Sequence, residues 1–221
     1  MKNKGILIVI SGPSGAGKGT ICKQLLDNNT YWLSISATTR TCRAGEEEGK
    51  SYYFLTKEEF NTKIEQGDFL EYAQNYGNMY GTPRSKVMEK LDDGQVVILE
   101  IDIQGALKVK ESFPEGIFIF LLPPSMEELK QRIINRASET PESLMTRFKS
   151  AYKEINYISK YNYAVINDTV DSAVAKVESI ITAETCRVDR MKEKILDSKE
   201  GLIHEQLYDW SINSRFIKSS G

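Results

Sequence analysis

A glycine-rich segment that directly follows a short apolar run constrains this chain more than any other feature. The apolar run covers residues 6–10 and reads ILIVI, and the glycine-rich segment covers residues 12–20 and reads GPSGAGKGT. It matches the pattern G-x-x-x-x-G-K, in which a strand gives way to a loop and then to a helix. Glycines let successive main-chain N–H groups face an anion, and the helix adds its positive end. The segment predicts a loop that binds the phosphates of a nucleoside triphosphate.

Lys18 is expected to reach the outer phosphates with its mobile ammonium group. The pattern departs from its common form at the next position, because the hydroxyl residue comes one place late, at Thr20. A magnesium-ligand role for Thr20 is in doubt for this reason. The alternative for the whole segment is a strand-to-helix turn with an incidental lysine. The expected ATP-binding residues are Gly12, Pro13, Ser14, Gly15, Ala16, Gly17, Lys18, Gly19 and Thr20.

The charge balance of the chain argues against some classes of function. The formal net charge is −2 over 221 residues, whereas general binders of nucleic acid or membrane surfaces carry a basic excess. We therefore expect no nucleic-acid or membrane partner, and phosphate binding must depend on local arginines. The widely spaced Cys22, Cys42 and Cys186 predict free thiols in a reducing compartment. No N-terminal signal is visible, so the expected location is cytoplasmic.

Short apolar runs alternate with helix-like segments, which predicts an α/β fold with a mainly parallel sheet. Continuous apolar runs are typical of strands that helices cover on both faces. Such runs lie at residues 5–10, 95–101, 116–122 and 164–167, with a weaker fifth run at 32–36. Helix starts are predicted by capping boxes at 56–59 and 125–128 and by the prolines that follow Thr82 and Thr140, and a helix end by Gly94.

The domain organisation follows from changes in pattern along the chain. Residues 36–82 carry short alternating segments and five of the eleven tyrosines, which predicts a small insert of mixed strands and one helix. Residues 137–141 are expected to form a mobile loop between two charged helices. A long helix is expected to run from about residue 170 toward Lys199. We expect one domain over residues 1–200 and a tail of unassigned role over 201–221.

Two arginines three residues apart, Arg40 and Arg43, lie in a polar loop of this insert. Guanidinium groups bind phosphate through paired N–H donors, so two of them match a dianionic monophosphate. Taken alone, the loop could equally be a solvated basic surface. Tyrosine and threonine hydroxyls and the carboxylate of Glu71 in the same insert favour a binding site.

Two acidic residues finish the expected strand at 95–101. Glu100 and Asp102 are two apart, so their side chains leave the same face of a strand. Buried carboxylates are costly as core packing, and ligands of open α/β sheets collect beyond the carboxyl ends of strands. We expect the pair to lie beside the phosphate-binding loop. The alternative is that both carboxylates simply face solvent.

Several segments in one order resemble the guanylate kinase family. They are the phosphate-binding loop, SATTRTCRAGE at 36–46, GKSYYF at 49–54, NMYGTP at 78–83 and LEIDIQG at 99–105. The resemblance extends from about residue 5 to residue 185. It implies a three-layer P-loop fold with a central five-stranded parallel sheet, a small mixed α/β insert that binds GMP at about 36–82, and a helical lid at about 130–150.

The resemblance implies Mg²⁺-dependent transfer of the γ-phosphoryl group of ATP to GMP, which gives ADP and GDP in purine nucleotide metabolism and GMP recycling. Guanine suits a carboxylate acceptor, because its N1–H and exocyclic amine are adjacent donors, whereas adenine has no donor at N1. The implied phosphate ligands of GMP are Ser36, Arg40, Arg43, Tyr52 and Tyr80, and the implied guanine ligands are Glu71, Thr82 and Asp102. Taken singly, Glu71 could also be a solvated residue of an alternating strand.

The implied metal is Mg²⁺ held mainly through ATP, with Glu100 contacting it through water and Thr20 as a further candidate. The implied catalytic residues are Lys18, Arg132, Arg136 and Arg147. Phosphoryl transfer requires positive charge around the migrating group, and the family's lid brings arginines over the triphosphate. At helical spacing, the same arginines could instead form surface ion pairs.

The chain departs from the family pattern in two places. Asn135 and Ala137 flank Arg136, where glycine is usual, and Cys42 stands where proline is common. The first change predicts a stiffer lid, and the second a slightly looser arginine loop.

Other functions and properties stay open at this stage. A non-catalytic guanylate-kinase-like interaction module is one alternative, although such modules have degraded phosphate loops and this loop is intact. Another nucleoside monophosphate kinase is a second, since residues 17–20 also resemble the adenylate kinase loop. We expect dGMP to be accepted, and the chain to be a monomer or a homodimer.

Overall fold

The structure is a computed structural model that describes residues 4–27, 30–75, 77–135 and 141–191, with the backbone alone described at 135, 141–144, 146 and 147. Contacts divide the chain into two units, residues 1–178 and 179–221, and each is considered by itself. Within the described residues, no helix has the length and apolar character needed to cross a membrane.

The first unit contains the predicted five-stranded parallel sheet, with the order β2-β7-β1-β8-β9. The strands are β1 (Ile6–Ser11), β2 (Tyr31–Leu33), β7 (Val96–Glu100), β8 (Ile117–Leu122) and β9 (Tyr163–Ile166). The weakest strand prediction, at residues 32–36, is confirmed only in part, because β2 ends at Leu33. The central strand β1 is buried along its whole length, as its continuous apolar sequence predicts.

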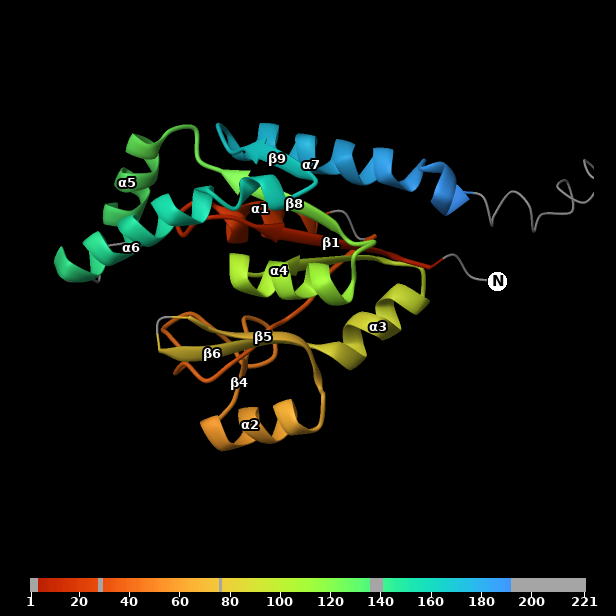
Figure 1. The fold of residues 1–221 in the computed structure, drawn as a ribbon, viewed down its shortest axis with the longest axis horizontal. Coiled ribbons are helices and arrows are strands. Elements are labelled where there is room, and N and C mark those ends of the chain that lie inside the picture. Colours follow the sequence, from red (N-terminus) through yellow and green to blue (C-terminus); the bar gives the residue numbers. More distant parts are fainter. Residues whose placement is uncertain (1–3, 28–29, 76, 136–140, 192–221) are drawn as a thin grey trace, which may run out of the picture. The chain divides into compact units, whose positions relative to one another are not determined.

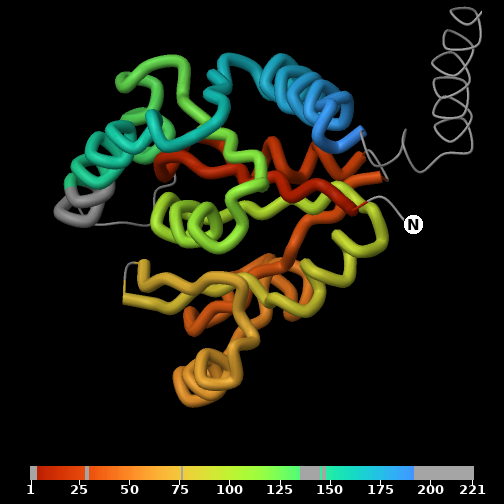
Figure 2. Tube along the Cα trace, turned by 45° about the vertical axis from the view of Figure 1, so that its right-hand side comes forward, coloured from red at the N-terminus to blue at the C-terminus, as the bar shows by residue number. Residues whose placement is uncertain are grey.

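Helices pack on the sheet through apolar side chains that alternate along its strands. Leu7 and Val9 of β1 join a buried cluster with α3 (Arg84–Asp92) and α4 (Ile103–Ser112). Helix α1 (Lys18–Leu25) buries Ile21 and Leu25 and also contacts β7. Figures 1 and 2 both show α3 and α4 between the sheet and the insert. This arrangement places the insert next to the carboxyl ends of β1 and β7.

The insert is a separate small sheet with one helix, as predicted. Its strands β3 (Ala37–Thr38), β4 (Tyr53–Phe54), β5 (Phe69–Asn75) and β6 (Asn78–Pro83) follow the order β4-β3-β6-β5. Helix α2 (Lys57–Glu65) begins with the predicted capping box at Thr56. Its core contains stacked rings of Phe60 and Phe69, whose centroids lie 4.5 Å apart.

The predicted lid region consists of α5 (Met126–Asn135) and α6 (Pro141–Ile155), followed by the short helix η1 (Ile158–Lys160). Leu129 and Ile133 of α5 pack against Ala151 of α6. The Ser125 hydroxyl accepts a hydrogen bond from the Glu128 N–H, so this predicted cap is present. Most of the predicted mobile loop, residues 137–140, lies outside the described residues.

Two predictions of helix boundaries are wrong. Thr82 does not cap a helix, because it belongs to β6 and its hydroxyl donates to buried Glu71; α3 begins two residues later, at Arg84. The helix expected from about residue 170 toward Lys199 is interrupted, because α7 (Val170–Thr185) ends at Thr185; residues 188–191 are helical again, and 192–199 lie outside the described residues. In the second unit, the Thr185 hydroxyl donates to the Thr182 carbonyl, and the Cys186 N–H donates to the Ala183 carbonyl. Such bonds to the residue three places back tighten and end a helix.

The predicted helix end near Gly94 is confirmed. Asp93 caps α3, and Gly94 follows it with a φ of 80°. A left-handed glycine after the cap is typical of helix C-termini. The tail over 201–221 lies outside the described residues.

Candidate active site

One hollow brings together residues from the phosphate-binding loop, the insert and the end of β7. It encloses about 400 Å³, which is within the range of small-molecule sites. The predicted residues that line it are Gly12, Ser14, Gly15, Gly17, Lys18, Gly19, Ser36, Arg40, Arg43, Tyr52, Glu71, Tyr80, Glu100 and Asp102. The residues that the sequence suggested for two separate nucleotides therefore share one space.

The phosphate-binding loop connects β1 to α1 and requires glycine at defined positions. Gly12, Gly15 and Gly17 have φ values of 146°, 91° and 93°, which side chains rarely tolerate. Space is also lacking: a Cβ on Gly12 would lie 2.2 Å from the Leu121 carbonyl oxygen, and one on Gly17 would lie 2.3 Å from Nδ2 of Asn167. The loop can therefore curl closely enough for its N–H groups to surround an anion.

The ammonium group of Lys18 folds back over this loop. Its Nζ donates to the carbonyl oxygens of Gly12 and Pro13 at 2.7 and 3.2 Å. Burial lowers the pKa of Lys18, and the nearby carboxylate of Glu100 opposes that effect. The lysine is thus held against the loop and lines the hollow.

Three predicted members of the loop do not line the hollow. Pro13 contributes only its carbonyl to Lys18, and Ala16 is fully buried, with its carbonyl accepting from Nδ2 of Asn167 at 2.8 Å. Thr20 is exposed on the first turn of α1. Thr20, the hydroxyl residue that comes one place late, is not among the residues that line the hollow, and its role as a metal ligand stays a prediction.

Asn167 is a site residue that the sequence did not suggest. It follows β9, is 3% exposed, and holds the loop through the bond to Ala16. Its main-chain N–H donates to the Leu122 carbonyl of β8. The sequence did contain one signal for this role, because Asn167 is a polar residue at the end of an apolar run.

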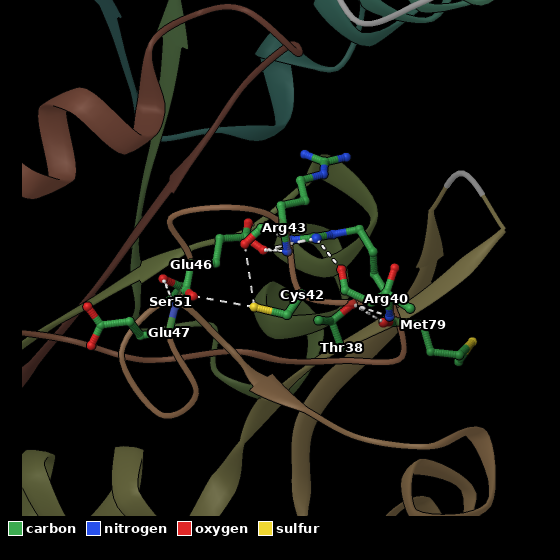
Figure 3. A network of polar contacts seen from close by, with 9 residues as sticks. Thr38, Arg40, Cys42, Arg43, Glu46, Glu47, Ser51 and Met79 are labelled. Atoms are coloured by element: carbon green, nitrogen blue, oxygen red, sulfur yellow. Dashed lines mark hydrogen bonds and ion pairs between the residues drawn. The ribbon is translucent and has the colours of Figure 1, made fainter.

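The arginine loop lies on the insert side of the hollow. Arg40 donates two hydrogen bonds to the carboxylate of Glu46, from Nη1 at 3.0 Å and from Nη2 at 2.8 Å. The Arg40 guanidinium carbon also lies 5.4 Å from the ring centre of Tyr52, within cation–π range. Figure 3 shows the Arg43 side chain extending away from the Glu46 carboxylate. Both arginines line the hollow.

The far end of the hollow carries the predicted guanine-reading residues. Glu71 is 6% exposed, and its Oε1 accepts from the Thr82 hydroxyl at 2.7 Å. Burial raises the pKa of Glu71 to about 7, and the negative charge of Asp102 adds to this effect. Asp102 caps α4 and accepts from the Gly105 N–H at 2.8 Å. Thr82 does not itself line the hollow, but it orients the Glu71 carboxylate.

Further lining residues were not anticipated: Ala73, Asn75, Asn78, Gly81, Ile101 and Glu154. Asn75 and Asn78 flank a hairpin turn, where asparagine has an ordinary conformational explanation. Glu154 comes from α6 and accepts from the Ser150 hydroxyl at 3.0 Å. Its sequence neighbours are those of a charged, solvent-exposed helix, so its position in the hollow could not be predicted from the sequence.

The predicted lid arginines are described to different extents. Arg132 does not line the hollow; its Nε donates to Glu128 at 3.0 Å, and its NH2 lies 3.5 Å from the Asn167 carbonyl. In this structure it forms the ion pair that the sequence offered as the alternative. Arg136 lies outside the described residues, and of Arg147 only the backbone within α6 is described.

Glu100, at the end of β7, lies close to the phosphate-binding loop. Its Oε1 lies 3.4 Å from the position that a Cβ on Gly19 would take. Across the residues that the structure describes, no cluster of three or more His, Cys, Asp or Glu side chains could hold a metal ion by itself.

A glycine-rich loop after the central strand of a parallel sheet, facing an arginine pair from a small insert, is the arrangement of a P-loop kinase of the nucleoside monophosphate class. Comparisons with known proteins identify the family. The family model described as guanylate kinase matches residues 4–184. The chain belongs to the guanylate kinase family.

The relatives support this assignment over nearly the whole chain. A guanylate kinase of Clostridium acetobutylicum is 72% identical over 95% of this chain and all of that protein. One from Clostridium tetani is 73% identical over 93% of this chain and 99% of that protein. The crystal structure of guanylate kinase from Anaplasma phagocytophilum superposes with a TM-score of 0.76 at 33% identity and covers 90% of this chain and 98% of that one.

Proposed function

We propose that this hollow holds the phosphates of ATP and the whole of GMP side by side, so that the γ-phosphoryl group passes directly between them. As a member of its family, the chain is an enzyme that phosphorylates GMP with ATP. The observation that carries the proposal is the shared lining of the hollow by the phosphate-binding loop, the arginine pair and Glu71. Direct transfer requires mainly positioning and charge stabilisation.

On the acceptor side, Arg40 and Arg43 would bind the GMP phosphate, with Ser36, Tyr52 and Tyr80 as hydroxyl donors. Glu71 and Asp102 would accept from the N1–H and exocyclic amine of guanine. Thr82 would act through Glu71, because its hydroxyl already donates to that carboxylate. Adenine has no N–H at N1, so bound AMP would leave one of these carboxylate oxygens without a hydrogen-bond donor. Unpaired polar groups of this kind discriminate strongly between substrates.

On the donor side, the curled loop would bind the ATP phosphates through its N–H groups, and Lys18 would move from the loop carbonyls to the outer phosphates. Arg132, Arg136 and Arg147 would neutralise the migrating group when the lid closes. For Arg132, closure must break the ion pair with Glu128. That exposed pair is a small obstacle, since such pairs contribute at most about 1 kcal/mol.

Magnesium fits this site as an ion held mainly by nucleotide oxygens. Mg²⁺ prefers oxygen ligands and commonly keeps several waters beside one or two carboxylates. Glu100, at the mouth of the loop, would contact it through water. The ion would supply neutralisation of charge on the ATP phosphates.

The substrate range and setting complete the proposal. None of the acceptor residues is assigned to the ribose, so dGMP would lose no assigned contact and would also be a substrate. The near-neutral charge balance favours a cytoplasmic enzyme of purine nucleotide metabolism without nucleic-acid or membrane partners. The free cysteines fit a reducing compartment.

A coupled assay with ATP and a panel of nucleoside monophosphates tests the proposal. We expect turnover of GMP and dGMP far above that of AMP, CMP or UMP. Lys18→Ala should lower turnover by orders of magnitude while the circular dichroism spectrum stays that of a folded protein. Preference for AMP or UMP would exclude the assigned guanine site.

A further inference from the structure

Glu46 lies outside the hollow, yet its carboxylate contacts both phosphate-binding arginines. Oε1 accepts from Nη2 of Arg40 at 2.8 Å, and Oε2 accepts from Nη1 of Arg40 at 3.0 Å. Oε2 also accepts from the main-chain N–H of Arg43 at 2.8 Å. Figure 3 shows these contacts converging on the one carboxylate. A single side chain thus fixes a guanidinium and the backbone from which the second guanidinium extends.

The charge of Glu46 is partly sheltered from water. Its side chain is 21% exposed and that of Arg40 is 11% exposed. The hydrogen bond to Arg40 lowers the pKa of Glu46, with a further contribution from the Arg43 N–H, and the same bond raises the pKa of Arg40. Glu46 is therefore ionised at neutral pH, and paired, charge-assisted bonds of this kind have defined geometry.

The rest of the arginine loop is held at its base. The Thr38 hydroxyl donates to the Met79 carbonyl of β6 at 2.9 Å, and the Met79 N–H donates to the Thr39 hydroxyl at 2.9 Å. At the other end, the Glu46 N–H donates to the Arg43 carbonyl, and the Cys42 thiol donates weakly to the Glu46 carbonyl. The Glu46 carboxylate connects the two ends of the loop.

We infer that Glu46 is a positioning residue, which holds Arg40 and Arg43 ready to receive the phosphate of the acceptor nucleotide. The inference rests on the proposed role of this arginine pair. Fixing an arginine side chain costs conformational entropy. When the arginine pair is already fixed in the free protein, this cost does not weaken the binding of the substrate. The carboxylate of Glu46 contacts the two arginines that would bind the GMP phosphate. Its loss should therefore raise the KM for GMP and leave the KM for ATP unchanged.

Glu46→Gln is the sharpest perturbation. The amide keeps one oxygen acceptor but turns its NH₂ group toward a guanidinium or an N–H donor, so the three-bond arrangement cannot form. Glu46→Asp keeps the charge but is one methylene shorter. Glu47→Gln is the matched control, since Glu47 is the next residue along the chain and pairs with Lys50 instead.

The experiment measures kcat and KM for both substrates, and binding of GMP and of guanosine, in the wild type and the three variants. We expect Glu46→Gln to raise the KM and Kd for GMP about tenfold, with the KM for ATP and the affinity for guanosine unchanged. Glu46→Asp should restore part of the loss, and Glu47→Gln should match the wild type.

The outcomes separate this inference from the proposed function. If wild-type protein bound GMP no better than guanosine, the proposed phosphate site itself would fail. If the wild type bound GMP as expected and Glu46→Gln changed its Kd less than twofold, or tightened it, the positioning role would be wrong. Equal losses for guanosine and GMP would indicate general damage to the insert and would also overturn the inference.

Discussion

Replacing Glu71 with glutamine is expected to stabilise the nucleotide-free protein at alkaline pH and to have a much smaller effect on its stability at pH 5. Glu71 is 6% exposed, and burial raises its pKa from 4.5 to about 7. An acid with a raised pKa binds its proton more tightly in the folded than in the unfolded protein. Its ionisation therefore destabilises the fold progressively as the pH rises from about 4.5 to about 7.

The magnitude follows from the two pKa values. A difference of about 2.5 in pKa corresponds to about 3 kcal/mol of folding free energy, fully lost above pH 7 and retained below pH 4.5. Glutamine cannot ionise, yet its oxygen can still accept from the Thr82 hydroxyl as Glu71 does at 2.7 Å. The variant should then exceed the wild type by about 3 kcal/mol at pH 8.

Urea unfolding of both proteins without nucleotide, at pH 5, 6, 7 and 8, measures this difference. Other titrating groups are common to both proteins and cancel in the comparison. Glu47→Gln serves as the control for the loss of a carboxylate exposed to solvent. A stability difference for Glu71→Gln that stays constant over this range, or that favours the wild type at pH 8, would refute the reasoning.

The remaining predictions concern the same end of the hollow. Glu71→Gln should weaken GMP binding about tenfold or more while ATP binding stays the same; calorimetry with each nucleotide checks this, and equal losses would contradict guanine reading. Gly105→Ala should raise the KM for GMP, because the new Cβ would lie 2.7 Å from Oε2 of Glu71, whereas the KM for ATP should not change. Since alanine favours a helix over glycine by about 1 kcal/mol, a more stable Gly105→Ala protein with unchanged KM for GMP would show that no clash occurs.

Features of the chain with local causes were predictable from the sequence. The strands of the central sheet follow from continuous apolar runs, and the phosphate-binding loop follows from glycines whose positive φ values the structure confirms. The capping box at Thr56 is equally local, because its two bonds join residues three apart.

Features that depend on distant contacts were not predictable. Thr82 has the local pattern of a helix cap, but its hydroxyl donates a hydrogen bond to the buried carboxylate of Glu71 on the neighbouring strand. Asn167 lies 151 positions from the Ala16 carbonyl that it holds. Arg132 shows the converse: its spacing allowed a catalytic or a surface role, and the structure places it in an ion pair with Glu128.

The shared hollow is tested most directly with a compound that joins adenosine to guanosine through a phosphate chain long enough to include those of ATP and GMP. If both nucleotides occupy one continuous space, this compound should compete with GMP and with ATP, and its Kd should lie far below that of either. Competition with only one of the two, at an affinity no better than that nucleotide alone, would contradict the account.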